Sequence, residues 1–377
     1  MGRPLGVTAG DWTERYTYDS AGNQTSARWP GRARDTQGGE RTYSGTRLVG
    51  ADGLRYEYDD AGRVVLRQKQ RLSRKPETWR YTWDAEDRLE SCTTPDGTEW
   101  RYTYDALGRR TAKHRMTADG HAVAATVRFA WDGTQLAEET DTATGVTLTW
   151  EYEGPQPMSQ LERRLPADTG QQEVDSRFFA IVTDVIGAPT ELVDEQGDIA
   201  WHKRSTVWGV TSRNRDARAL TPLRFPGQYA DQETGLHDNL NRHYDPETAR
   251  YMSADPHGLV PAPNPAAYVV NPFTWMDPEG LIAKGCTQEG GWYGGCCRRT
   301  GWRAEASIRR RWRSTTSRPR QPARTSLSLA SISRTSRTRC RWSTMVLLFA
   351  WSTRSTESST APGPRRSPWR GISGSAS

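Results

Sequence analysis

The chain of 377 residues is long enough for two or three domains, and its formal net charge is +7. This charge is unevenly distributed: residues 282–377 contain 18 Arg and 1 Lys against 3 Glu and no Asp, whereas residues 1–281 carry a net charge of −9. The total charge therefore gives no support for nucleic-acid binding by the body of the protein. Only 6 Phe accompany 16 Trp and 14 Tyr, which favours thin aromatic sheets over a thick aliphatic core. The longest apolar run, residues 345–351, is too short to span a bilayer, so we expect no membrane insertion.

The first feature along the chain is an internal repeat of the form aromatic-x-aromatic-Asp. Copies begin at Tyr16, Tyr56, Tyr81, Tyr102 and Phe129, and from Asp59 onward the turn aspartates recur every 21 to 27 residues. Aromatic residues two positions apart lie on the same face of a strand, and Asp-x-x-Gly suits a tight turn. The repeat therefore predicts β-hairpins that pair side by side into a long antiparallel sheet of roughly ten to fourteen strands. Its aromatic face is expected to pack between neighbouring strands; the alternative is an exposed carbohydrate-binding platform.

The first copy of the repeat begins close to the N-terminus. No secretory leader, with a basic segment followed by an apolar one, is visible before it. We therefore expect the chain to be part of a longer array. Residues 178–209 contain two further turns, Asp184-x-x-Gly187 and Asp194-x-x-Gly197, only ten residues apart. This spacing predicts a tight meander that continues the sheet.

A block at residues 223–281 contains two Asp-Pro-x-Gly turns, which begin at Asp255 and Asp277 with 18 residues between them. Two carboxylates brought close together cannot both ionise easily, so one keeps its proton. The ionised partner can activate a water, and the protonated partner can donate to a scissile carbonyl. Asp-Pro-x-Gly is also an ordinary turn sequence, which is the alternative explanation for each copy.

The chain resembles the Rhs (YD-repeat) family, which includes bacterial polymorphic toxins, the C component of insecticidal Tc toxins and, more distantly, the teneurins. The resemblance covers roughly residues 12–281 and rests on the Tyr-Asp repeats and on Phe-Pro-Gly-Gln-Tyr from Phe225, Glu-Thr-Gly-Leu from Glu233, Arg-His-Tyr-Asp-Pro from Arg242 and Asp-Pro-Glu-Gly-Leu from Asp277. It implies an all-β sheet that spirals as part of a hollow shell around a C-terminal toxin.

The resemblance also implies the chemistry of toxin release. Asp residues at the positions of Asp255 and Asp277, and an Arg at the position of Arg242, are associated in this family with a single-turnover aspartyl self-cleavage. The scissile bond here would join Leu281 to Ile282. No cofactor and no metal are expected, and the expected partners are the chain's own C-terminal segment, a secretion apparatus and an immunity protein. The full-length protein is expected to be secreted or at the cell surface.

The sequence departs from the family pattern at two places near Arg242. Thr248 and Ala249 stand where family members commonly carry a Gly before the Arg, and residues 237–241 lack the usual aromatic residues. We expect these departures to leave the turns intact and to affect the packing around Arg242.

Three domains are predicted: a YD-repeat shell fragment at residues 1–222, a core with the self-cleavage motif at residues 223–281, and a variable tail at residues 282–377. From residue 282 the tail contains no Asp, Asn or His, and its Cys spacing fits no zinc site. It is interpreted as a frameshifted translation, with a basic disordered arm that binds nucleic acid and an unfamiliar toxin as alternatives. The alternative function for the whole chain is a non-enzymatic, carbohydrate-binding adhesion module.

Overall fold

The computed structural model describes residues 2–285 except residues 11, 31–35, 71–73, 165–174, 213 and 215. From residue 286 onward the predicted tail therefore lies outside the described residues. The three interpretations of the tail stay predictions for the same reason. Every regular element of the described part is a β-strand, and neighbouring strands pair antiparallel, which confirms the predicted all-β class. No helix with the length and hydropathy needed to cross a membrane occurs in this part of the chain.

The strands form four sheets. The first sheet contains β1 (Gly6–Ala9), β2 (Trp12–Tyr18), β3 (Gln24–Pro30) and β4 (Thr36–Gln37). The second has 15 strands in sequence order: β5 (Arg41–Ser44), β6 (Arg47–Ala51), β7 (Leu54–Tyr58), β8 (Val64–Lys69), β9 (Glu77–Trp83), β10 (Leu89–Thr93), β11 (Glu99–Tyr104), β12 (Arg110–Met116), β13 (Val123–Asp132), β14 (Gln135–Asp141), β15 (Val146–Glu153), β16 (Gln156–Arg164), β17 (Asp175–Thr183), β18 (Pro189–Asp194) and β19 (Ile199–His202). Two small sheets follow: β20 (Tyr229–Ala230), β21 (His237–Asn239), β22 (Arg242–Asp245) and β23 (Arg250–Tyr251), then β24 (Trp275–Met276) and β25 (Lys284–Gly285).

The array is longer than the repeat predicts. The described residues before position 203 contain 19 strands, against the roughly ten to fourteen expected. The difference arises because hairpins also form without the complete motif. One example is β15–β16, where Trp150 and Tyr152 are present but the turn Asp is not.

The Asp-x-x-Gly-Arg sequences that begin at Asp59 and Asp105 build a specific turn. At Asp105 the main-chain carbonyl accepts from Gly108 N at 3.0 Å, and Gly108 has a φ of +79°. The Asp105 carboxylate accepts from Arg109 N at 3.0 Å and from Arg109 Nε at 2.7 Å. Asp105 N also donates to Arg109 O at 2.9 Å, so the hairpin is a tight turn followed by a glycine bulge at Gly108. Asp59 and Asp84 make the same contacts with the Arg four residues later.

The paired aromatic residues hold successive hairpins together. The first Tyr of a repeat is buried, as at Tyr56 and Tyr102. The second aromatic residue is half-buried and donates its polar hydrogen to a main-chain carbonyl of a preceding strand: Tyr58 Oη to Leu48 O at 2.8 Å, Trp83 Nε1 to Val64 O at 2.8 Å and Tyr104 Oη to Leu89 O at 2.9 Å. The packing interpretation of these residues therefore accounts for their positions, and they do not form an exposed aromatic row.

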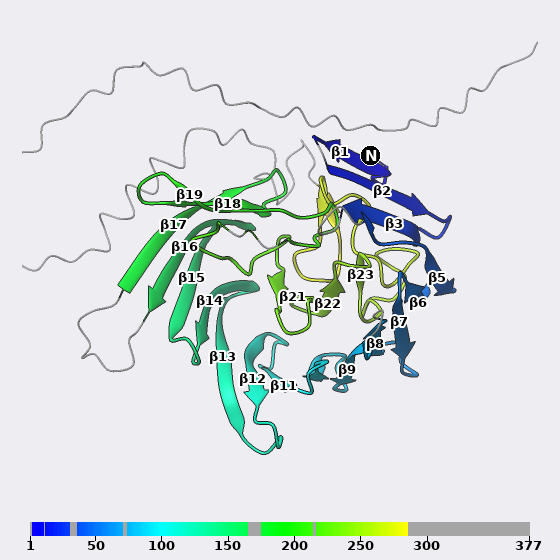
Figure 1. Ribbon diagram of the computed structural model, residues 1–377, viewed down its shortest axis with the longest axis horizontal. Coiled ribbons are helices and arrows are strands. Elements are labelled where there is room, and N and C mark those ends of the chain that lie inside the picture. The colour runs from blue at the N-terminus through cyan, green and yellow to red at the C-terminus, as the bar shows by residue number, and fades with distance from the viewer. Residues whose placement is uncertain are drawn as a thin grey trace, which may run out of the picture.

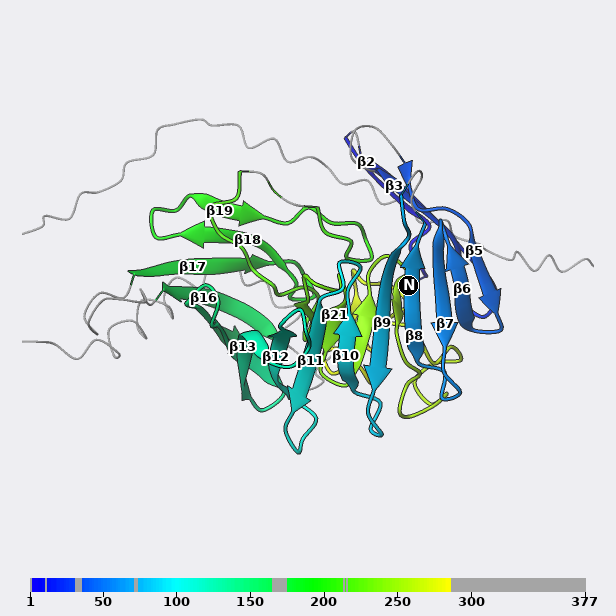
Figure 2. The same cartoon turned by 60° about the horizontal axis from the view of Figure 1, so that its bottom comes forward.

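The large sheet curves around residues 223–281, which lie in its concavity (Figure 1). Turning the view shows the strands from β5 to β11 standing side by side in front of this segment (Figure 2). Buried ion pairs join the two parts: Arg110 Nη1 lies 2.7 Å from Asp231 Oδ2, and Lys113 Nζ lies 2.9 Å from Asp231 Oδ1 and from Glu233 Oε2. Charges buried in this way need their partners, so they fix how the segment sits on the sheet. The predicted domain boundary at residue 223 stays a prediction.

The first hairpin also reaches the enclosed segment. Asn23, in the turn between β2 and β3, is buried, and its Oδ1 accepts from Arg250 Nη1 at 3.1 Å and from Asn264 Nδ2 at 2.7 Å. Asn271 Nδ2 donates to Gly2 O at 3.2 Å. The two ends of the described chain are therefore packed against each other.

Candidate functional site

The structure brings Arg242, Asp255 and Asp277 together. Arg242 begins β22, Asp255 opens the turn after β23, and Asp277 directly follows β24. All three are buried, with exposed fractions of 3%, 7% and 1%. Their predicted association in space is therefore observed, whereas their part in a cleavage reaction stays a prediction.

Arg242 lies between the two carboxylates. Its Nη2 is 2.7 Å from Asp255 Oδ2 and 3.3 Å from Asp277 Oδ2. Nη1 donates to Pro265 O at 3.1 Å, and Nε donates to Gly280 O. Every nitrogen of the guanidinium is thus used, which fixes its plane and gives both carboxylates one shared cation.

The pKa of Asp277 is raised above its usual range, first of all because the carboxylate is buried. Hydrogen bonds from Tyr251 Oη at 2.8 Å and Leu281 N at 2.9 Å oppose this, as does the charge of Arg242. The charge of Asp255 is the smallest of these contributions. The main cause of the raised pKa of Asp277 is therefore burial, and repulsion from Asp255 contributes less.

Residues 277–281 are clamped onto the β21–β22 hairpin. Asn239 Nδ2 donates to Asp277 O at 2.9 Å, Asn241 Nδ2 donates to Glu279 O at 2.8 Å, and Arg242 Nε donates to Gly280 O. Gly280 has a φ of +68°, and a Cβ at this position would lie 2.5 Å from Asn239 O. The final Asp-Pro-Glu-Gly turn is thus held along its main chain, and its Gly is required by the close approach.

The predicted scissile bond follows this clamp directly. Leu281 is half-buried, and 49% of the Ile282 side chain is exposed. Beyond it, β25 pairs with β24 through only two residue pairs, and Lys284 Nζ lies 3.9 Å from Glu279 Oε1. The bond therefore lies in an accessible loop that is firmly held on its N-terminal side.

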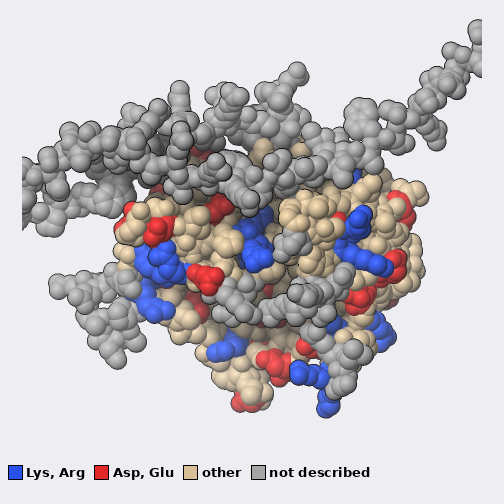
Figure 3. Space-filling model, turned by 45° about the horizontal axis from the view of Figure 1, so that its top comes forward, with Lys and Arg blue, Asp and Glu red and all other residues tan. Residues whose placement is uncertain are grey.

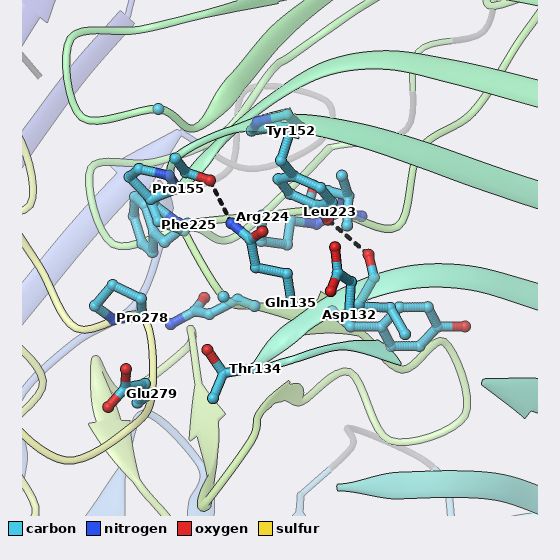
Figure 4. Close-up of a pocket in the computed structure, with 18 of the residues that line it drawn as sticks. Asp132, Thr134, Gln135, Tyr152, Pro155, Leu223, Arg224, Phe225, Pro278 and Glu279 are labelled. Atoms are coloured by element: carbon cyan, nitrogen blue, oxygen red, sulfur yellow. Dashed lines mark hydrogen bonds between the residues drawn. The ribbon is translucent and has the colours of Figure 1, made fainter. Parts of the chain in front are cut away.

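The Phe-Pro-Gly-Gln-Tyr motif packs against the other side of the same turn. Gly227 has a φ of +80°, and a Cβ there would lie 1.9 Å from Pro278 O. Beside this contact is a cavity of about 440 Å³ that also borders Arg224, Pro278 and Glu279 (Figure 4). The motif thus supports the turn through direct main-chain contact.

The two departures from the family pattern have different consequences. Ala249 has a φ of +60°, a conformation that favours Gly, so the missing Gly places an Ala in a strained position. Arg242 nevertheless stays fully packed. In residues 237–241, the Asn239 amide donates both to Tyr251 Oη and to Asp277 O. Arg242 is therefore closely packed despite both departures.

Sequence reasoning missed two side chains, Tyr251 and Asn239, and the carbonyl of Pro265. Tyr251 stacks under Arg242, whose Cζ lies 3.7 Å from the ring centroid, and its hydroxyl contacts Asp277. Its position four residues before Asp255 was the available signal, because a short connection keeps the two residues near each other. Pro265 O accepts from Arg242 Nη1 and from Asp255 N at 2.9 Å, which no side-chain pattern could reveal.

The described residues contain no group of three His, Cys, Asp or Glu side chains placed to hold a metal ion. Basic and acidic side chains are interspersed on the face of the described part that Figure 3 shows. That face therefore presents mixed charge and not a basic surface.

Comparison with known proteins places these observations in a family. Residues 2–266 match the family model described as teneurin YD-shell. The chain is 38% identical over 290 residues to double-stranded DNA deaminase toxin A of Burkholderia cenocepacia, covering 71% of this chain and 19% of that protein. It is 33% identical over 324 residues to toxin protein Tse5 of Pseudomonas aeruginosa, covering 73% and 24%. The TcdB2-TccC3 crystal structure aligns with a TM-score of 0.29 at 16% identity, covering 72% of this chain and 21% of that one. The chain spans about a fifth of the length of these relatives.

Proposed function

Because the chain belongs to the teneurin YD-shell family, we propose that it is the C-terminal part of an Rhs-type toxin that cuts itself after Leu281. The observation that carries the proposal is the meeting of Arg242, Asp255 and Asp277 beside the clamped residues 277–281. Two carboxyl groups, one with a raised pKa, supply the acid and base that peptide hydrolysis needs.

In the proposed reaction the Asp255 carboxylate takes a proton from water. The resulting hydroxide oxygen bonds to the carbonyl carbon of Leu281, and the Leu281–Ile282 C–N bond then breaks. Asp277 donates the proton that the departing amine requires. The products are an amine at Ile282 and a carboxylic acid at Leu281, which loses its proton to solvent, so one water is consumed and no cofactor is needed.

The geometry after the cut favours release of the C-terminal side. The N-terminal product remains held by the contacts of residues 277–281. In the described residues, the contacts that hold the C-terminal product include the β24–β25 pairing, the Lys284–Glu279 pair and the packing of Ala283 against the core. A two-stranded pairing of this size is marginal in water. The same proposal makes this chain part of a longer protein that carries a C-terminal toxin as cargo. That protein would act outside the producing cell, with a secretion apparatus and an immunity protein as partners.

The test is the cleavage of the complete 377-residue chain, followed by gel electrophoresis and mass spectrometry. The unchanged chain is expected to yield a fragment that ends at Leu281, and Asp277→Asn to leave the chain intact. Asp245→Asn is the matched control, because Asp245 is equally buried and is bonded by Tyr56 Oη at 2.8 Å, away from Arg242. Cleavage at Leu281 by the Asp277→Asn chain, or a folded unchanged chain that stays intact, would refute the proposal.

A further inference from the structure

Tyr251 connects the two parts of the site that hold Asp277. Its hydroxyl lies 2.8 Å from Asp277 Oδ2 and 2.8 Å from Asn239 Nδ2. Asn239 Nδ2 also lies 2.9 Å from Asp277 O, which can only accept a hydrogen bond. The atom that faces this carbonyl must therefore be the amide nitrogen, so the orientation of the Asn239 amide is fixed by its surroundings.

This orientation decides where the Tyr251 hydrogen points. An amide nitrogen only donates, so the Tyr251 oxygen accepts from Asn239 and its own hydrogen is directed at Asp277 Oδ2. Burial, and next the charge of Asp277, hold the pKa of Tyr251 well above its usual range. Tyr251 therefore keeps this hydrogen and is a lasting donor to the carboxylate.

The two oxygens of the Asp277 carboxylate consequently differ. Oδ2 accepts from Tyr251 Oη and, at 3.3 Å, from Arg242 Nη2, which fills the acceptor positions of this oxygen. Within the described part of the chain, Oδ1 accepts one hydrogen bond, from the Leu281 N–H at 2.9 Å, and this leaves it a second acceptor position. A proton that Asp277 binds is therefore excluded from Oδ2.

We propose that Tyr251 is a positioning residue that restricts the acid proton of Asp277 to Oδ1, the oxygen beside the scissile residue Leu281. The inference rests on the self-cleavage proposed above and adds which oxygen delivers the proton. The titratable and charged groups that face Asp277 come from several elements: Arg242 on β22, Tyr251 on β23, Asp255 in the following turn and Tyr268 in the loop before β24.

The experiment compares the complete chain with its Tyr251→Phe variant. Phe keeps the ring under Arg242 and removes only the hydroxyl. Chains isolated in denaturant are refolded by dilution into buffers of different pH, and the rate of fragment formation is followed on gels. Because the acid must be protonated, the rate falls as pH rises through the pKa of Asp277. The lost hydrogen bond favours the charged form, so the variant is expected to move this falling limb to higher pH and to cleave about tenfold more slowly below it.

Tyr244→Phe is the matched control. Tyr244 is fully buried, its ring centroid lies 6.0 Å from that of Tyr251, and its hydroxyl donates to Trp208 O at 2.8 Å. Tyr251→Phe loses two buried hydrogen bonds and Tyr244→Phe loses one, but only Tyr251→Phe removes a donor to Asp277. Tyr244→Phe is therefore expected to keep the pH profile of the unchanged chain.

A second variant, Asn239→Ala, removes the donor that directs the Tyr251 hydroxyl, and a smaller shift in the same direction is expected. The inference would be overturned if both Tyr251→Phe and Asn239→Ala kept the rate and the pH profile of the unchanged chain. If Asp277→Asn still abolished cleavage in that case, the proposed function would stand. Cleavage in Asp277→Asn would instead overturn the proposed function.

Discussion

The contact between Gly227 and Pro278 gives the sharpest stability prediction. At a φ of +80°, an Ala in place of Gly227 meets left-handed strain, and its Cβ would lie 1.9 Å from Pro278 O and 2.8 Å from Pro278 Cα. Left-handed strain costs about 1 kcal/mol, and overpacking against main chain adds about 1–3 kcal/mol. Gly227→Ala should therefore lower the free energy of unfolding by about 3 kcal/mol.

Gly108→Ala separates these two contributions. Gly108 has nearly the same φ, +79°, but no heavy atom lies within 4 Å of its added Cβ, so only the strain of about 1 kcal/mol is expected. Both substitutions are measured by urea denaturation in the Asp277→Asn chain, which keeps the polypeptide uncleaved. Equal losses for the two variants would refute the close contact at Pro278. In the cleavable chain, only Gly227→Ala should slow the cut, because it displaces the turn that carries Asp277.

Two further substitutions test the surroundings of the site. Ala249→Gly relieves left-handed strain at a φ of +60° and should raise the free energy of unfolding by about 0.5–1 kcal/mol, as followed by thermal melting; a loss of stability would contradict the strain. Asn23→Ala leaves hydrogen-bonding groups of Arg250 and Asn264 unpaired and should lower stability by about 1–3 kcal/mol while also slowing fragment formation at Leu281. An unchanged rate of cleavage in Asn23→Ala would contradict a role of the first hairpin in supporting the site.

The strand array was predictable because its rules are local. An aromatic pair two residues apart fixes the face of a strand, and Asp-x-x-Gly-Arg fixes the turn, as the contacts of Asp105 and Arg109 show. Hairpins with only part of this motif, such as β15–β16 without the turn Asp, were not predicted because their pairing is set by neighbouring strands. The all-β architecture followed from the repeat, but the number of strands did not.

The candidate site was predictable only in its charged residues. Arg242, Asp255 and Asp277 stand out by their motifs and meet as expected. The sequence could not reveal that Arg242 would lie between the carboxylates or that burial would dominate the pKa of Asp277, because both depend on packing between distant segments. Nor could it reveal Asn239, because the contribution of this residue depends on how its side-chain amide is oriented.

The bond between Asn23 and Asn264 has a consequence for the order of folding. Asn264 precedes Pro265, whose carbonyl positions both Arg242 and the main chain of Asp255, so a turn 241 residues upstream supports the site. Contacts that close such long loops carry a large entropic cost and form late. The proposed cut would therefore be timed by folding itself: a chain whose array is still incomplete keeps its C-terminal segment attached, and cleavage reports that the first hairpin has docked.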